Sequence, residues 1–342
     1  MGKGHLGDRC RVPVRPTYPS AMTPPAAQEP PPTPVPDLAA EPASIVVTVD
    51  TGDRIHVLDW GGPAAGLPAL LLVHGLAGTA WAWAPVARRL CRSTRVLAVD
   101  LRGHGLSESP RTGYDLDSLA YDLLTVLVAH GFGPDARGPA AVVAGHGFGA
   151  QVAAWTARIL PAAVAGLALV DGGWEELEAT LRLDPAEFLR GLGEPPEVLA
   201  SMAAYLADRR EWDPASWDAD QERAARAAVD EKHSGRVVLL VRRHVLAGSV
   251  AAMFAYRPEE ALGELTIPLL VLVAEAGGSD DETARERRLA LADLERARAS
   301  RGRPAARVVR FVGVAHNLMR YRPEQLSAEL LGLLAAARES PA

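Results

Sequence analysis

Short apolar runs that alternate with helical segments constrain the fold of this chain more than any other feature. Continuous apolar runs occur within 68–75, 93–100, 140–145, 166–172 and 267–275. Such runs are typical of strands that are buried on both faces of a parallel sheet. Several segments between them, such as "DLDSLAYDLLTVLVAHG", carry apolar residues at helical spacing. The alternation predicts an α/β fold with a doubly wound, mostly parallel sheet.

Two parts of the chain lack this alternation, and they set the predicted domain boundaries. Residues 1–43 are rich in proline and poor in large apolar groups, so they are predicted to form a disordered tail. Residues 174–262 are predicted to be helical or irregular and to add no strand to the sheet. Because this insert lies between two sheet strands, we expect it to cover the carboxyl edge of the sheet as a helical cap. The predicted core is then formed by 44–173 and 263–342.

Composition argues against several classes of function. The 342-residue chain has a formal net charge of −6, which gives no reason to expect nucleic acid or an anionic membrane as a partner. No apolar stretch approaches the roughly 20 residues that span a bilayer, and Cys10 and Cys91 do not suggest a disulfide framework. The histidines show no metal-ligand spacing. The sequence therefore predicts a cytoplasmic protein without metal or cofactor, whose partner is a small molecule.

A glycine-rich turn follows the strand at 140–145 and precedes a helix. Its sequence is Gly145-His146-Gly147-Phe148-Gly149. In the G-x-S-x-G nucleophile elbow, which has the same strand–turn–helix context, the central residue is the serine that attacks the substrate. Here the central residue is Gly147, which has no side chain to act as a nucleophile.

Four landmarks in a fixed order make the chain similar to a known family. His74-Gly75 follows a strand, and "DLRGHGLSE" at 100–108 follows the next one. The glycine-rich turn comes third, and His316 lies between a late strand and the final helix. Over about residues 45–337 the chain resembles the α/β-hydrolase family. The resemblance implies the sheet of that family with an inserted helical cap.

The resemblance also implies roles for particular residues. The backbone N–H groups of Leu76 and Phe148 would form an oxyanion hole, which needs no side chain. His316 would be the general base, since an imidazole exchanges a proton near neutral pH. His104 and His146 are interpreted as structural residues of the two turns.

The acid that would orient His316 has more than one candidate. The usual family location is the loop after the strand at 267–275, where Asp280 and Asp281 are the first aspartates. Both also fit a helix N-terminus, which favours acidic residues for local reasons. Asp171, at the end of the strand at 166–172, is the alternative.

An apolar substrate pocket is predicted near these landmarks. Its candidate residues are His74, Trp81, Trp83, Met253 and Phe254. Aromatic residues at such spacings are also common in plain hydrophobic cores. The arginine-rich segment at 285–303 is interpreted as a solvated helix face.

Gly147 excludes the covalent acyl-enzyme of the family, because no nucleophile stands at the elbow. One hypothesis is a hydrolase-family enzyme that acts on a small apolar ester or acyl substrate without a covalent intermediate. His316 would then act as general base beside the oxyanion hole. A non-hydrolytic lyase, cyclase or cofactor-free oxygenase would use the same groups. The other hypothesis is an inactive pseudoenzyme that binds a small apolar ligand, and such a binder has no use for a carboxylate beside His316.

Overall fold

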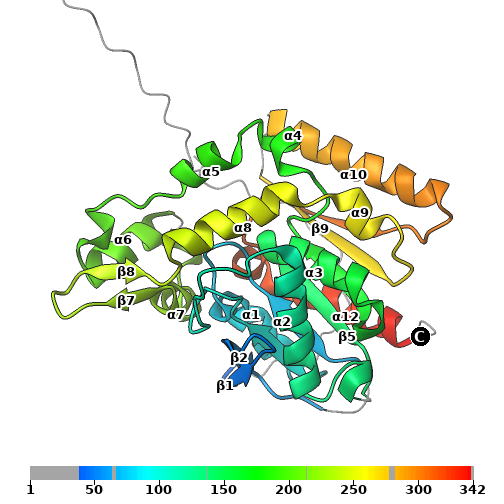
Figure 1. Ribbon diagram of the computed structural model, residues 1–342, viewed down its shortest axis with the longest axis horizontal. Coiled ribbons are helices and arrows are strands. Elements are labelled where there is room, and N and C mark those ends of the chain that lie inside the picture. The colour runs from blue at the N-terminus through cyan, green and yellow to red at the C-terminus, as the bar shows by residue number, and fades with distance from the viewer. Residues whose placement is uncertain (1–37, 64–66, 137, 213, 277–281, 340–342) are drawn as a thin grey trace, which may run out of the picture.

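The computed structural model describes residues 38–63, 67–136, 138–212, 214–276 and 282–339. Within these residues an eight-stranded sheet has the order β1-β2-β4-β3-β5-β6-β9-β10. The β1–β2 and β2–β4 pairs are antiparallel, and all other neighbours in the sheet are parallel. The predicted α/β fold with a doubly wound, mostly parallel sheet is confirmed (Figure 1).

Strands β3, β4, β5, β6 and β9 coincide with the five apolar runs, to within three residues at each end, and three further strands complete the sheet. The bounds of the strands are Ala43–Thr48 (β1), Arg54–Asp59 (β2), Leu70–Val73 (β3), Val96–Val99 (β4), Ala141–His146 (β5), Val164–Val170 (β6), Leu269–Glu275 (β9) and Arg307–Val312 (β10). The central strands are buried along their whole length, which explains why they carry no polar alternation.

Helices cover both faces of the sheet. One face packs against Leu116–Ala129 (α2), Phe148–Ile159 (α3), Pro258–Leu262 (α9) and Glu282–Ser300 (α10). The other face packs against Ala84–Leu90 (α1), Leu318–Tyr321 (α11) and Pro323–Glu339 (α12). Strand β3 shows the division, because Leu71 and Val73 belong to the first core and Leu70 and Leu72 to the second.

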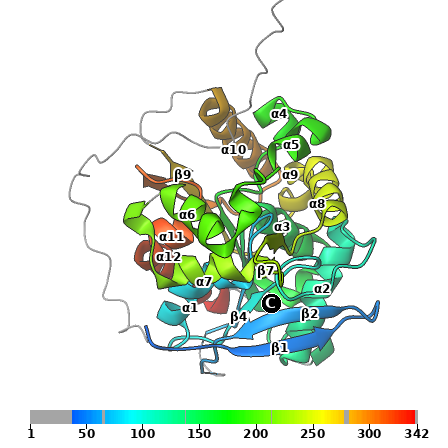
Figure 2. The same cartoon turned by 90° about the vertical axis from the view of Figure 1, so that its left-hand side faces the viewer.

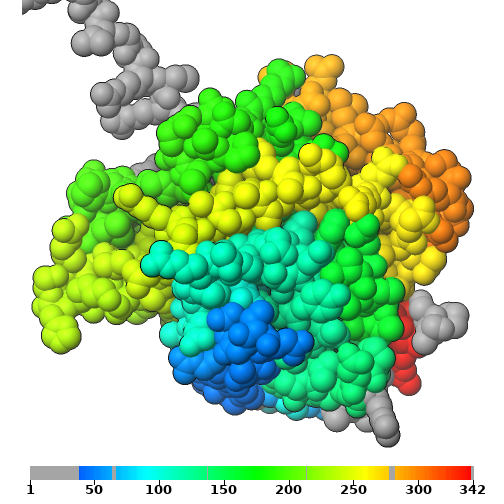
Figure 3. All heavy atoms as spheres, viewed as in Figure 1, coloured from blue at the N-terminus to red at the C-terminus, as the bar shows by residue number. Residues whose placement is uncertain are grey.

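The insert between β6 and β9 contains mainly helices. They are Leu177–Leu181 (α4), Pro185–Gly191 (α5), Met202–Trp212 (α6), Ala219–Ala227 (α7) and Arg243–Ala255 (α8), followed by α9. In Figure 3 the yellow surface of α8 runs between the green surface of the α4–α5 segment and the cyan surface of the core. Figure 2 shows α4 and α5 on the opposite side of the molecule from β1 and β2.

The insert also contains a small hairpin that the sequence pattern did not predict. Val229–Glu231 (β7) pairs antiparallel with Val237–Leu239 (β8), apart from the main sheet. The helix that follows this hairpin begins only at Arg243. The physical reason is that the β-branched Val237 and Val238 suit a strand better than a helix.

The N-terminal boundary differs slightly from the predicted tail. Residues 1–37 lie outside the described residues, while β1 begins at Ala43, the last residue assigned to the tail. Before β1, the carbonyl of Ala40 and the carboxylate of Glu41 accept hydrogen bonds from Arg88. Residues at the end of the predicted tail thus already contact the core.

Candidate active site

The glycine-rich turn forms a tight link between β5 and α3. Gly147 is the N-cap of α3 and has φ 54° and ψ −115°, a backbone conformation that strains any residue with a Cβ. The outer glycines are needed for a different reason. A Cβ on Gly145 would lie 2.1 Å from the carbonyl oxygen of Gly149, and one on Gly149 would lie 2.4 Å from that of His74. The turn thus has the sharp strand-to-helix geometry of a nucleophile elbow.

His316 lies in the loop after β10 and bonds to a carboxylate from β6. Its Nδ1 is 2.7 Å from Oδ2 of Asp171, the residue that follows β6 and is 3% exposed. The carboxylate accepts a hydrogen bond from Nδ1–H, which leaves the lone pair on Nε2 available to accept a proton. The His316 side chain is 54% exposed, so a small molecule can reach it.

Two further groups, one of them charged, hold Asp171 as a carboxylate. Its Oδ1 accepts hydrogen bonds from the backbone N–H of Ala274 and from Nη2 of Arg287, each at 2.9 Å. Burial alone would raise the pKa of Asp171, but the charge of Arg287 and the hydrogen bond from His316 outweigh it. The pKa of Asp171 therefore lies well below its usual range, and Asp171 stays ionised beside His316.

Gly147 and His316 face each other. A Cβ built on Gly147 would lie 3.2 Å from Nε2 of His316 and 3.4 Å from its Cε1. In the family the nucleophile projects from this position of the turn, so Nε2 of His316 faces the place where that side chain would stand.

Two backbone N–H groups near this position have no acceptor. Neither Leu76 nor Phe148 donates its backbone N–H to any of the described residues. Phe148 is the first residue of α3, where backbone N–H groups have no partner within the helix. Leu76 lies in the turn closed by the hydrogen bond from Gly78 N to Gly75 O.

A cavity of about 470 Å³ opens onto these groups. Gly75, Leu76, Gly147, Phe148 and His316 line it on the sheet side. Elements of the insert line the other side with apolar groups, among them Leu177, Leu181, Phe188, Leu192 and Met253. Residues of the insert and of the glycine-rich turn thus line the same cavity.

The chain is similar in sequence and in fold to known proteins. A model of the alpha/beta hydrolase family matches residues 70–329. The chain belongs to the alpha/beta hydrolase family. Its members place catalytic groups on the loops after the strands, where His316, Asp171 and Gly147 of this hydrolase-family chain lie.

Named relatives match this alpha/beta hydrolase over part of their length. Non-heme chloroperoxidase of Streptomyces lividans is 40% identical over 126 residues, 36% of this chain and 43% of that protein. 2-(Acetamidomethylene)succinate hydrolase of Mesorhizobium japonicum is 33% identical over 179 residues, 51% of this chain and 60% of that protein. The crystal structure of E-2-(acetamidomethylene)succinate hydrolase has a TM-score of 0.69 at 23% identity. It covers 86% of this chain and 99% of that one, which shows a shared fold.

The structure brings some of the predicted site residues together and keeps others apart. Gly147, His316, Asp171, Leu76, Phe148 and Met253 all line the cavity. The candidate acids Asp280 and Asp281 lie outside the described residues. Asp171, the alternative acid, is the carboxylate that the structure places against His316.

Four predicted pocket residues do not line this cavity. His74 is fully buried beneath its loop, where Nε2 accepts from Leu101 N and Nδ1 bonds to Gly75 O. Trp83 belongs to the core beside α1, and Phe254 packs against Phe188 with ring centroids 5.7 Å apart. Trp81 packs between Trp60 and Arg223, which joins the core to the insert. These aromatic side chains are therefore packing residues, which is the alternative that the sequence had left open.

The two turn histidines lie close to the site. Nε2 of His146 lies 3.0 Å from the backbone oxygen of His316, and the two rings are 4.2 Å apart. Burial, followed by the nearby charge of His316, lowers the pKa of His146 to about 3, so His146 is neutral. His146, interpreted from the sequence as a structural residue, is also among the residues that line the cavity. His104 is buried against His74, and burial lowers its pKa to about 3.

Sequence reasoning missed several polar residues of the cavity wall, among them Gln151, Glu175 and Arg287. Arg287 belongs to the segment interpreted as solvated, but its side chain is only 21% exposed. A signal was available, because Arg287 continues the helical spacing of the buried Leu291 and Leu294.

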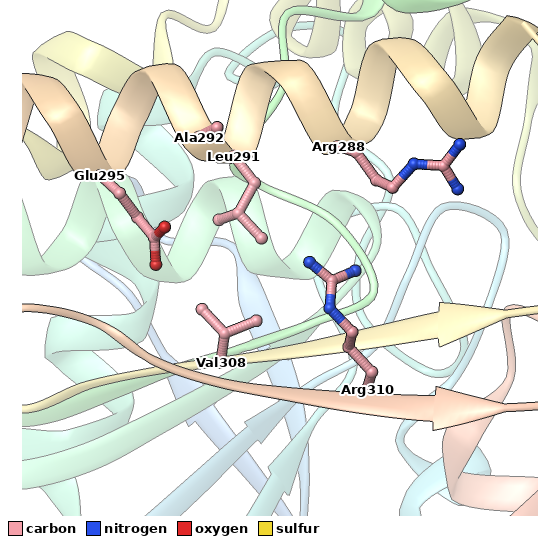
Figure 4. Close-up of a pocket in the computed structure, with 6 residues that line it drawn as sticks. All are labelled: Arg288, Leu291, Ala292, Glu295, Val308 and Arg310. Carbon is pink, nitrogen blue, oxygen red and sulfur yellow. The ribbon is translucent and has the colours of Figure 1, made fainter.

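A second hollow, of about 330 Å³, lies between α10 and the edge strand β10 and shares no lining residue with the first (Figure 4). Figure 4 shows Val308 and Arg310 rising from the strand toward the helix. Arg310 is paired with Glu275 at 2.5 Å. We assign no chemistry to this hollow.

The described residues were also compared with the requirements of a metal site and of a membrane-spanning helix. Among the described residues, no three histidine, cysteine, aspartate or glutamate side chains are grouped to hold a metal ion. Within the same residues, no helix combines the length and the apolar character that crossing a bilayer requires.

Proposed function

We propose that this alpha/beta hydrolase hydrolyses a small, largely apolar acyl substrate by direct attack of water. The observation that carries the proposal is that Nε2 of His316 faces the Cβ position of Gly147 at 3.2 Å, while Nδ1 is held by Asp171. A pure binding protein has no use for a carboxylate on the remote nitrogen of a partly exposed histidine.

The proposed reaction needs no covalent intermediate. Nε2 of His316 removes a proton from water as the water oxygen bonds to the substrate carbonyl carbon. The carbonyl oxygen becomes an oxyanion that accepts hydrogen bonds from the N–H groups of Leu76 and Phe148. The C–O or C–N bond to the leaving group then breaks, and the imidazolium returns its proton to that group. Asp171 stabilises the imidazolium between the two steps.

The relatives support acyl or C–N bond hydrolysis as the reaction class. A 2-(acetamidomethylene)succinate hydrolase is among them by sequence. When a serine protease loses a triad member, its oxyanion hole and substrate binding still give about 10³–10⁴-fold acceleration over water, and the same contributions would remain at a site without an elbow nucleophile. Slow turnover is therefore expected.

The test is a series of p-nitrophenyl esters of increasing acyl length. We expect slow turnover without an initial burst of p-nitrophenolate, since no acyl-enzyme accumulates. His316→Ala should lower kcat by about 10²–10⁴-fold. Intact mass after incubation with a fluorophosphonate should be unchanged.

Two results would contradict the proposal. Wild-type and His316→Ala proteins that hydrolyse every ester at the same rate would favour a binding protein. A stoichiometric fluorophosphonate adduct would show an activated nucleophile elsewhere in the chain.

A further inference from the structure

Gln151 places an unpaired amide in the wall of the cavity. It lies in the first turn of α3, three residues after Phe148, and is 2% exposed. Its Oε1 is buried without a hydrogen-bond partner. Its Nε2 also has no hydrogen-bond partner among the described residues, but Nε2 is not fully buried as Oε1 is.

An unpaired buried amide is unfavourable for the folded protein. Methionine or leucine would fill a similar volume at this position without that cost. A ligand in the cavity offsets the part of this cost that falls on Nε2 when it accepts a hydrogen bond from that atom. Gln151 thus has the properties of a side chain that forms a hydrogen bond with a polar group of a bound ligand.

The charges on the cavity wall favour a neutral ligand. The charged carboxylates and cations that line it are Asp171, Glu175 and Arg287. Arg287 is bonded to both carboxylates, at 2.9 Å from Asp171 and 3.1 Å from Glu175. Among the described lining residues, the only arginine is therefore already paired, and a carboxylate on the ligand would meet a net negative wall.

We propose that Gln151 is the specificity-determining residue for a neutral substrate whose acyl part carries a hydrogen-bond acceptor such as an amide carbonyl. This rests on the proposed function of the same site. Nε2 of Gln151, the amide atom that is not fully buried, donates to that carbonyl oxygen. Gln151 and Phe148 are about one helical turn, roughly 5 Å, apart along α3, so we expect the acceptor to lie a few bonds from the reacting carbonyl. The apolar groups that the insert adds to the wall would contact an alkyl group.

The inference is tested by binding, which does not depend on turnover. The probes are N-acetylglycinamide and 4-methylpentanamide, which have nearly the same shape and share a terminal carboxamide that stands for the reacting group. Affinities are measured by calorimetry for the wild-type protein, Gln151→Met and Gln325→Met. Gln325 is exposed on α12 and provides the matched control.

We expect wild-type protein to bind the acetamido compound, and Gln151→Met to weaken that binding about tenfold. The same substitution should leave the affinity for 4-methylpentanamide unchanged or higher. Gln325→Met should match wild type with both probes. An equal effect of Gln151→Met on both probes, or no binding of the acetamido compound, would overturn the inference.

The p-nitrophenyl esters of the same two acyl groups separate this inference from the proposed function. Selective binding with no ester hydrolysis would retain the role of Gln151 and reject the hydrolytic reaction. Hydrolysis with equal preference in wild-type and Gln151→Met proteins would retain the reaction and reject the role of Gln151.

Discussion

At the scale of single residues, Gly147 decides which chemistry is open to this protein. The turn keeps its φ of 54° and its place opposite His316, but no side chain projects from it. Glycine relaxes the strain that a serine would carry there. The same residue thus removes the covalent route and stabilises the turn.

The substitution Gly147→Ser tests both consequences. The new side chain at positive φ should lower the free energy of unfolding by about 1–3 kcal/mol, measured by urea denaturation. Its hydroxyl would project toward Nε2 of His316, so a burst of p-nitrophenolate from short activated esters should appear. The double variant with His316→Ala should lose the burst. Serine without any gain in hydrolysis would mean that the base or the oxyanion donors are misplaced.

Asp171 gives a prediction on pH and stability. Its pKa in the folded protein is depressed below the ordinary value of 3.8, so the carboxylate stabilises the fold above about pH 4 and this contribution is lost as the pH falls. The difference in unfolding free energy between wild type and Asp171→Asn should therefore shrink from pH 6 to pH 3. The control Asp293→Asn, on an exposed residue, should show no such trend. A difference that stays constant over this range would contradict the depressed pKa.

At the scale of elements, helix α10 places the cation Arg287 beside the candidate acid Asp171. Its buried stripe is formed by Arg287, Leu291, Leu294 and Arg298. The two leucines pack on the sheet, while Arg287 also lies over the ring of Trp174 at 4.7 Å. The helix thus carries apolar packing and the counter-charge for two buried carboxylates in one stripe.

Arg287→Met is expected to keep the packing and remove the charge. Asp171 and Glu175 would then be left buried without their cation, which should lower the free energy of unfolding by about 3 kcal/mol. The matched control Arg296→Met, on the exposed side of the same helix, should change it by less than about 0.5 kcal/mol. Equal, small effects of both substitutions would show that the Arg287 ion pairs add little to stability.

At the scale of the whole molecule, a chain of ion pairs joins the N-terminal segment, the core and the insert. Glu41 bonds to Arg88 of α1 at 2.9 Å and to Arg223 of α7 at 2.5 Å. Arg88 also bonds to Asp220 at the start of α7. Arg223 stacks on Trp81, 3.6 Å from the ring centroid. These contacts hold the α6–α7 end of the insert to the core.

Two truncations test where the folded part begins. Deleting residues 1–37 is expected to leave Tm unchanged, because their proline-rich composition buries little apolar surface. Deleting residues 1–42 also removes Glu41 and should cost about 1 kcal/mol, the scale of partly exposed ion pairs. A lower Tm for the shorter truncation would show that residues before 38 contribute to the fold.

Local pattern sufficed for the parts of this protein that depend on neighbouring residues in the chain. The strand runs, the glycine-rich turn and the family landmarks predicted the sheet, because burial on both faces requires continuous apolar residues. Gly147 and His316 could be singled out for the same reason, since a turn motif and a residue after a strand are local features. The absence of an elbow nucleophile is likewise read directly from the sequence.

Tertiary structure decided what depends on residues far apart in the chain. Asp171 meets His316 because β6, β9 and β10 are neighbours in the sheet, and their 145-residue separation leaves no local pattern. Trp83 is core while Gln151 lines the cavity, although their residue types suggest the reverse. Side-chain burial is set by the packing of whole elements against one another, whereas the sequence pattern specifies the elements one at a time.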